Sequence, residues 1–249
     1  MADFLDLTTA VETDTAGRLT VSPDTIAVDG LTRSDRSNVA FDYGVGYFNG
    51  NFTHRHYVDW ASGTDSGSVF SWALTNTPNT AWTGIGEGGI VGSNLDGISF
   101  RHNLSTDYYW TLFESDAGAQ YAVSFLDSGG DAPRYIEIYR DESTLGPNGG
   151  GYLYADIYSD DTYSTLVGSV QLNLHNLYDF RYLYPMMPRD DNNAFNWTGT
   201  VGKVYFLSEQ IGSIVIPRIV GSRLKDALAM SLLPDIVRPW LVGTPKVSP

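Results

Sequence analysis

Apolar and polar residues alternate with a period of two along almost every segment between residues 18 and 207. Successive side chains of a β-strand point to opposite faces, so this period predicts strands that are buried on one side only. No stretch with the helical period of about 3.6 residues interrupts the pattern in this region. The sequence therefore predicts an all-β protein.

Clusters rich in Gly, Asp, Asn and Pro separate the expected strands. The expected strands include 52–60, 70–74, 109–114, 121–126, 134–141, 151–158, 165–174, 180–184 and 201–207. The expected turns are 61–68, 75–97, 127–133, 142–151 and 188–199. Short strands at close spacing with such turns are typical of an antiparallel sandwich or barrel, and 249 residues are enough for one such domain.

The charge balance is acidic, with 29 Asp and Glu against 15 Lys and Arg and a formal net charge of -14. A surface of this sign repels phosphate backbones and anionic lipid, so we expect neither nucleic acid nor a membrane as a partner. The chain has no cysteine, which excludes disulfides, thiolate zinc sites and cysteine nucleophiles. The N-terminus has neither the basic nor the apolar segment of a signal peptide.

The composition changes near residue 209, where Tyr, Phe and Asn disappear and aliphatic residues and prolines take over. We therefore expect two parts, a sandwich domain over residues 1–208 and an apolar docking extension over residues 209–249, with a short helix at about 222–232. The residues expected to make assembly contacts are Ile214, Ile216, Leu228, Leu232 and Trp240. The alternative is that this extension packs on its own sandwich.

Several stretches resemble a known family. They include "YGVGYFNGNFTHRHYVDW" (43–60), "YIEIYRD" (135–141) and "FRYLYPMMPRDDNNAFNWTGTVGKVYFL" (180–207). They are similar to phage and viral-metagenome proteins with a concanavalin A-like jelly roll of the laminin-G and lectin type. The resemblance covers roughly residues 18–208. It implies a two-sheet antiparallel jelly roll located in a virion. Without a signal peptide we expect synthesis in the host cytoplasm, and the apolar extension leads us to expect other virion proteins and further copies of this chain as partners.

Two histidines stand two residues apart in the strand 52–60. His54 and His56 therefore point to one face, as a metal pair would, but Phe52, Val58 and Trp60 share that face. No nearby His or acid is placed to supply a third ligand, so we expect buried histidines that bond to backbone or hydroxyl groups, and no metal. His102 and His175 are isolated in the sequence.

Hydrolases of this superfold carry the pattern Glu-x-Asp-x-Glu on one strand, with three acids on one face. The nearest match here has Glu137 and Asp141, but Tyr139 stands where the middle acid is needed. Without that acid the nucleophile loses the partner that tunes its pKa. The sequence therefore favours a protein that is not an enzyme and has no catalytic residues.

Tyrosines gather on one side of a predicted hairpin. In residues 134–141 and 151–158 the aliphatic side chains alternate with tyrosines and acids, and the connecting turn "ESTLGPNGGG" allows the two strands to pair. We call the polar side the tyrosine face. Its predicted ligand-binding residues are Tyr135, Glu137, Tyr139, Tyr152, Tyr154 and Tyr158, and Asp141 and Asp156 lie among them. Such a face suits stacking on sugars or burial in a subunit interface, and an ordinary cross-strand aromatic ladder is the third interpretation.

The acidic turns at residues 159–163 and 188–195 leave Ca2+ open as a cofactor, although neither has the spacing of a calcium loop. No other cofactor is expected. The first functional expectation is a non-enzymatic structural protein of the virion, in the capsid or in a tail or fibre. The alternative is a carbohydrate-binding adhesion module, and a glycoside hydrolase ranks third.

Overall fold

The computed structural model describes residues 4–32, 35–63, 67–78, 82–83, 96–104, 108–116, 119–129, 132–190, 196–211 and 214–216. The expected helix at 222–232, together with Leu228, Leu232 and Trp240, lies outside the described residues. Within them, the one helical element is a 3-10 turn at Leu7–Thr9, capped by the Asp6 carboxylate, which accepts the Thr8 amide. The part of the chain that the structure describes has no helix long and apolar enough to cross a membrane.

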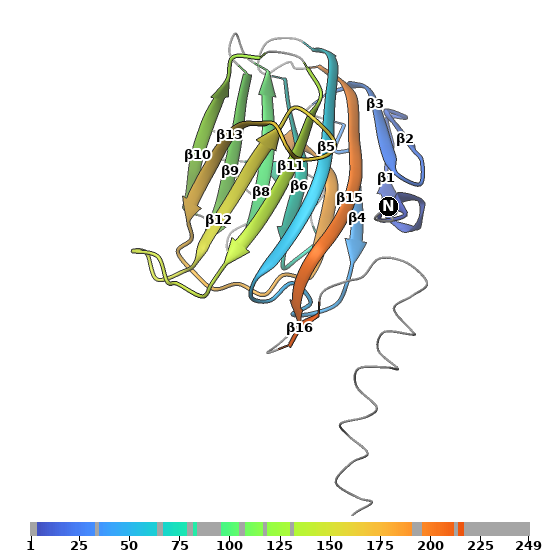
Figure 1. Cartoon of the computed structure of the whole chain (residues 1–249). Helices are drawn as coiled ribbons and strands as arrows, with labels where there is room; N and C mark the ends of the chain where they lie inside the picture. The colour runs from blue at the N-terminus through green and yellow to red at the C-terminus, as the bar shows by residue number, and fades with distance from the viewer. Residues whose placement is uncertain are drawn as a thin grey trace, which may run out of the picture.

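Two sheets of eight strands pack face to face, as the sequence predicts (Figure 1). Sheet A has the order β1 (Val11–Thr13), β4 (Asn38–Asp42), β14 (Tyr182–Asp190), β6 (Gly67–Thr75), β8 (Gly97–Leu104), β9 (Tyr108–Asp116) and β10 (Ala119–Asp127). Sheet B has the order β13 (Leu166–Asn173), β12 (Tyr152–Tyr158), β11 (Arg134–Asp141), β5 (Phe52–Gly63), β15 (Trp197–Ile211), β3 (Thr25–Leu31) and β2 (Leu19–Val21).

Two short strands complete the sheets. β7 (Trp82–Thr83) pairs in parallel with β14, and β16 (Ile214–Ile216) pairs with β15. All other pairings are antiparallel. The all-β antiparallel two-sheet sandwich is therefore confirmed.

Several strands differ from the sequence prediction. The strands β1, β2, β3, β4, β7, β8 and β16 have no counterpart among the expected strands. β8 begins at Gly97, the last residue of the turn expected at 75–97, and β14 continues to Asp190 through the start of the turn expected at 188–199. β14 is a central strand although it contains Pro185 and Pro188, which cannot donate to a ladder. The register of β14 against β4 shifts between Leu183 and Met186, so an irregularity in the pairing accommodates Pro185.

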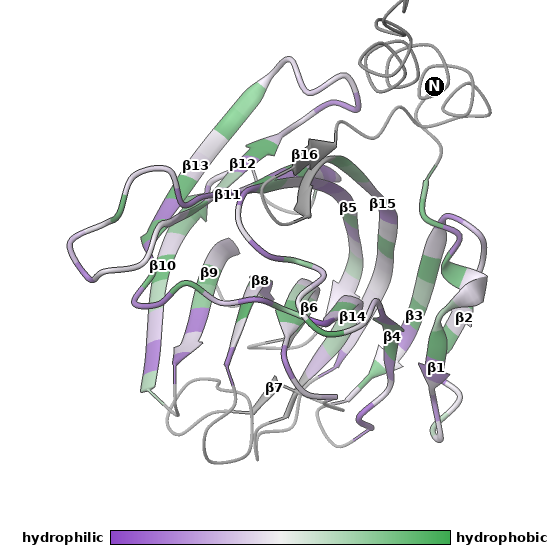
Figure 2. Ribbon diagram, turned by 90° about the horizontal axis from the view of Figure 1, so that it is seen from below, coloured by the Kyte–Doolittle hydropathy of each residue, from purple (hydrophilic) through white to green (hydrophobic). Residues whose placement is uncertain are grey.

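The space between the sheets holds the main hydrophobic core, in which Trp72, Phe100, Ile136 and Leu153 are fully buried. Figure 2 shows the two layers edge-on, with hydrophobic and hydrophilic positions alternating along the strands. The aliphatic residues of the hairpin β11–β12 belong to this core, as their spacing predicts. A second, smaller cluster of Phe70, Ala73, Phe113, Tyr184 and Met187 is also buried and stands apart from the main core.

Arg140 fixes the glycine-rich turn that precedes β5. Its side chain is fully buried, and its guanidinium donates to the backbone carbonyl oxygens of Gly50 at 2.6 Å, Phe48 at 3.0 Å and Tyr178 at 2.6 Å. Glu142 supplies the nearest countercharge at 3.3 Å. Burial lowers the pKa of Arg140 to about 10, well above neutral pH, so the group keeps its charge. The stretch at residues 43–50 is therefore scaffold.

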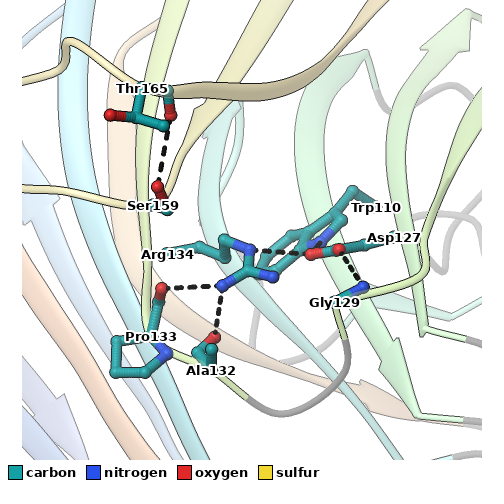
Figure 3. A network of polar contacts seen from close by, with 8 residues as sticks. All are labelled: Trp110, Asp127, Gly129, Ala132, Pro133, Arg134, Ser159 and Thr165. Atoms are coloured by element: carbon teal, nitrogen blue, oxygen red, sulfur yellow. Dashed lines mark hydrogen bonds and ion pairs between the residues drawn. The ribbon is translucent and has the colours of Figure 1, made fainter.

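A second buried arginine closes the turn between β10 and β11 (Figure 3). Arg134 Nε donates to Asp127 Oδ2 at 2.7 Å, and the same oxygen accepts Trp110 Nε1 at 3.2 Å. The other oxygen of Asp127 accepts the Gly129 amide at 2.8 Å. These donors hold the pKa of Asp127 below its usual value against the opposing effect of burial. The network ties the end of sheet A to the start of β11 in sheet B.

The expected boundary at residue 208 falls inside a strand. β15 continues to Ile211, where Glu209 pairs with Phe52 of β5, and β16 brings Ile214 and Ile216 into sheet B. The first residues of the expected extension are thus paired backbone of the sandwich. The division of the chain into two parts stays a prediction.

Candidate functional site

The tyrosine face is the outer surface of β11 and β12, and strand register extends it over five strands of sheet B. Residues that pair directly across an antiparallel ladder lie on the same face. The rows are Leu166–Tyr158–Tyr135–Tyr57, then Ser169–Asp156–Glu137–Arg55–Tyr205, then Gln171–Tyr154–Tyr139–Thr53, then Asn173–Tyr152–Asp141. The six residues predicted from the sequence therefore lie together on one surface, and two rows of tyrosine enclose a row of charged groups.

The tyrosine rows are partly buried and make ordered ring contacts. Tyr139 and Tyr154 stack with ring centroids 4.7 Å apart and an interplanar angle of 12°. Tyr152 lies beside Tyr154 at 6.0 Å. Among the described residues, Tyr154 is the one ring that contacts Tyr139, and the neighbour of Tyr139 on β5 is the small residue Thr53. Within the described part of the chain, the second face of the Tyr139 ring therefore has no aromatic cover.

The charged row is internally paired. Arg55 Nε donates to Glu137 Oε2 at 2.5 Å, and Arg55 Nη1 donates to the Tyr205 hydroxyl at 3.3 Å. Asp156 accepts a hydrogen bond from Ser169 Oγ at 2.5 Å. The Glu137 carboxylate is therefore held in an ion pair with Arg55, whereas a carboxylate nucleophile needs an oxygen that is free to reach the substrate.

A turn covers one part of this surface. Tyr163, between β12 and β13, places its ring 3.8 Å from the guanidinium carbon of Arg55. Its ring also contacts Tyr158 at 5.4 Å, Tyr135 at 6.1 Å and Tyr205 at 6.4 Å. Tyr163 has φ of 56°, a left-handed conformation that is costly for a bulky side chain and persists only where contacts enforce it. The tyrosine face thus has a covered half under Tyr163 and an open half around Tyr139, Tyr152 and Tyr154.

The phenols stay protonated at neutral pH. Burial, followed by the nearby Asp156 charge, raises the pKa of Tyr139 to about 12. Burial and the Asp141 charge raise the pKa of Tyr154, and burial and the Asp156 charge raise that of Tyr158. Each hydroxyl can therefore donate as well as accept a hydrogen bond.

Sequence reasoning missed several members of this surface. Arg55 and Tyr57 lie on the outward positions of the strand 52–60, and their alternation with His54 and His56 is the signal that could have placed them. Tyr163 carries no such signal, because it comes from a turn whose path only the folded chain defines.

The paired histidines are buried as expected, and His56 bonds to a hydroxyl group, but His54 bonds to an indole N–H, which was not expected. His54 and His56 are fully buried in the core, where His54 Nδ1 accepts Trp72 Nε1 at 3.1 Å and His56 Nε2 lies 3.0 Å from Ser71 Oγ. Burial lowers the pKa of His56 to about 3, so its ring is neutral at physiological pH.

The two histidines that are isolated in the sequence have different environments. His102 is buried against Trp110, with ring centroids 4.2 Å apart. His175 lies at the surface, where its Nδ1 is 2.8 Å from Oε2 of the buried Glu114, and Oε1 of the same carboxylate accepts the His175 amide at 2.8 Å. This contact anchors the segment after β13 to β9 of sheet A.

The part of the chain that the structure describes contains no group of three or more His, Asp or Glu residues arranged for a metal ion. In the turn at 159–163 the Asp160 carboxylate instead accepts the amides of Thr162, Ser164 and Thr165. Of the other acidic turn, residues 191–195 lie outside the described residues.

No family model matches the chain, and no curated protein matches it. Among solved structures, the Ca2+-bound lumenal domain of VIP36 is similar at TM-score 0.51 and 7% identity, over 88% of this chain and 94% of that one. Tailspike protein 2 of the Escherichia coli O157:H7 bacteriophage CAB120 gives TM-score 0.44 at 9% identity over 82% of this chain. An alginate lyase from Pseudomonas aeruginosa gives TM-score 0.44 at 11% identity over 82% of this chain and 100% of that one.

The likeness to the VIP36 domain supports the fold, an antiparallel jelly-roll sandwich of the kind found in lectins, and is consistent with a concanavalin A-like fold. The match with the tailspike protein covers 25% of the length of that protein. The matching structures also include the enzymatically active domain of that tailspike protein, besides the lyase. The expectation that the chain is not an enzyme is therefore wrong as an exclusion, because it rested on one absent strand motif in a fold that enzymes share.

Proposed function

We propose that this chain is a carbohydrate-binding jelly-roll protein and that the open half of the tyrosine face holds the glycan. The observation that supports this is the stacked pair Tyr139–Tyr154 with Tyr152 beside it, outside the contacts of Tyr163. A pyranose ring has a flat face of C–H groups, and a tyrosine ring offers it apolar area and a hydroxyl on the same side chain.

The polar groups of the open half suit the hydroxyls of a sugar. Asp141 and Asp156 are hydrogen-bond acceptors, and Gln171 and Asn173 on β13 add amides at the edge of the same rows. The carboxylates and the net charge of -14 favour a neutral glycan over a polymer of acidic sugars.

Glycan-array binding of the purified chain tests the proposal. We expect binding to a set of neutral glycans, and a loss of about tenfold in affinity in Tyr139→Ala and in Tyr154→Ala, which corresponds to about 1.4 kcal/mol. Tyr109→Ala is the matched control, because Tyr109 is a partly buried tyrosine of β9 in sheet A. Absence of binding, or equal losses in all three variants, contradicts the proposal. Any glycan that binds should also be incubated with the chain and analysed for shortened products, which tests for activity.

We further propose that the chain is a component of a virus particle, as the resemblance over residues 18–208 implies. Residues beyond β16 are then the attachment element. Truncation should follow Ile216, because a cut after Ser208 would also remove the paired end of β15 and all of β16. We expect the truncated chain to fold but to be absent from purified particles, as measured by mass spectrometry. A truncated chain that is incorporated normally, or a full chain that is never found in particles, contradicts this assignment.

A further inference from the structure

The two sides of the sandwich end in very different edge strands. On one side, sheet A ends at β1 and sheet B at β2, and both strands have three residues. On the other side, sheet A ends at β10 with nine residues and sheet B at β13 with eight. Figures 1 and 2 both place β10 and β13 together on the side away from β1 and β2. A long edge strand presents a row of unpaired backbone groups, which proteins usually block with charges, proline or a covering segment.

The long edges carry none of these charges or prolines. Neither residues 119–126 of β10 nor β13 contains Asp, Glu, Lys, Arg or Pro. Asp127 at the end of β10 is buried and paired with Arg134, so its charge does not prevent another strand from pairing with this edge. This absence stands out in a chain that has 18% charged residues and a net charge of -14.

The edge of β10 is also open to solvent. Ala122, Val123 and Ser124 are successive exposed residues, although their side chains point alternately to the two faces. Exposure that ignores this alternation agrees with the sheet order, in which β10 pairs with β9 and no other described strand pairs with its second edge. Val123 is 39% exposed and Leu126 is 48% exposed.

The two edges form one uncharged surface. A Cβ at Gly168 of β13 would lie 2.1 Å from a ring carbon of Phe125 of β10, so the ring lies directly on the glycine backbone. Leu166 adds a side chain that is 55% exposed at the start of β13. The sandwich therefore presents a continuous uncharged strip along this side.

We propose that β10 pairs antiparallel with β10 of a second copy of this chain across a two-fold axis. A second copy carries the same net charge of -14, so two copies can approach closely only where acidic residues are absent, and β10 with β13 provides such a place. A basic partner would be drawn instead to the acidic remainder of the surface. Sheet A then continues from one copy into the other, and the unpaired backbone groups of β10 bond to each other.

The symmetry makes a specific distance prediction. Val123 is the middle residue of Ala119–Asp127, and a two-fold axis through the middle of the pair places Val123 opposite Val123 of the other copy. Directly opposed residues of an antiparallel pair have Cα atoms about 4.5–5.5 Å apart, which lies within the range that a disulfide spans.

Because the chain has no cysteine, this distance can be tested with one substitution. We expect Val123→Cys in the full chain to form a disulfide-linked dimer under mild oxidation, seen on a non-reducing gel and reversed by reductant. Val45→Cys is the control, since Val45 is 88% exposed and lies in the turn before β5, and it should stay monomeric on the gel.

The mass in solution provides the second measurement. Light scattering should give a dimer for the full chain and a monomer for Val123→Lys, with circular dichroism confirming that the variant is folded. A monomeric parent chain overturns the proposal. So does a dimer that Val123→Lys leaves intact, or a Val123→Cys variant that cross-links no more than Val45→Cys.

Discussion

The inner and outer faces of sheet B contain similar chemical groups in opposite states. On the inner face, Arg140 is fully buried and its guanidinium donates hydrogen bonds to backbone carbonyl oxygens. On the outer face, Arg55 is partly exposed and pairs with Glu137 under the ring of Tyr163. Because alternate residues of one strand supply both faces, the side of the sheet decides whether a charged or aromatic residue supports the fold or is available to a ligand.

The largest expected difference between the faces is in stability. Arg140→Ala should lower the free energy of unfolding by about 3–5 kcal/mol, because it leaves buried carbonyls without donors and Glu142 without its countercharge. Arg55→Ala is the matched outer variant and should cost about 1 kcal/mol or less, since the pair is partly solvated. Urea denaturation of both variants measures the difference, and equal losses would contradict the assignment of roles.

A buried histidine gives the second effect, which depends on pH. Burial lowers the pKa of His102 to about 3, from an ordinary value near 6.5, and among the described residues neither ring nitrogen has a hydrogen-bond partner. The unfolded state therefore binds a proton first as pH falls below about 6.5, and stability decreases toward pH 3 by about 1.4 kcal/mol per pH unit from this group. Above pH 6.5 His102 contributes no pH dependence.

Replacing the imidazole by an apolar ring should remove this contribution. At pH 7 we expect His102→Phe to have an unfolding free energy close to that of the parent chain. Between pH 7 and pH 4.5 the unfolding free energy of the variant should fall by about 2–3 kcal/mol less than that of the parent chain. Denaturation curves at several pH values measure the two slopes. If they are equal, His102 does not carry the acid sensitivity.

The smallest effect separates the two halves of the tyrosine face. Tyr163→Ala removes the ring from Arg55 and exposes Tyr135 and Tyr158, at a cost of about 1 kcal/mol in stability. If the covered half is closed to glycans only by this ring, the variant should bind additional glycans on an array and keep those of the parent chain. Loss of the parent's own glycans would instead place Tyr163 within the binding site.

Much of this arrangement could be predicted from alternation alone. The period of two placed Tyr139 and Tyr154 on one face and His54 and His56 on the other, because side-chain direction in a strand is a local property. The position of Tyr163 could not be predicted, because the path of a turn depends on contacts between segments that are distant in sequence. The pairing of Glu137 with Arg55 has the same origin, since β5 and β11 become neighbours only in the folded sheet.

The order of strands in sheet B also determines when the protein can fold. β5 forms its longest pairing with β15, so that Tyr57 lies opposite Gly202, and the strands between them in the chain belong partly to the other sheet. During synthesis, β5 therefore emerges long before this partner, and one of its edges stays unpaired until β15 follows. Folding dominated by such distant pairings is slow, on a scale of about milliseconds to seconds for small all-β domains. The platform that carries the tyrosines is thus completed only after nearly the whole sandwich has been made.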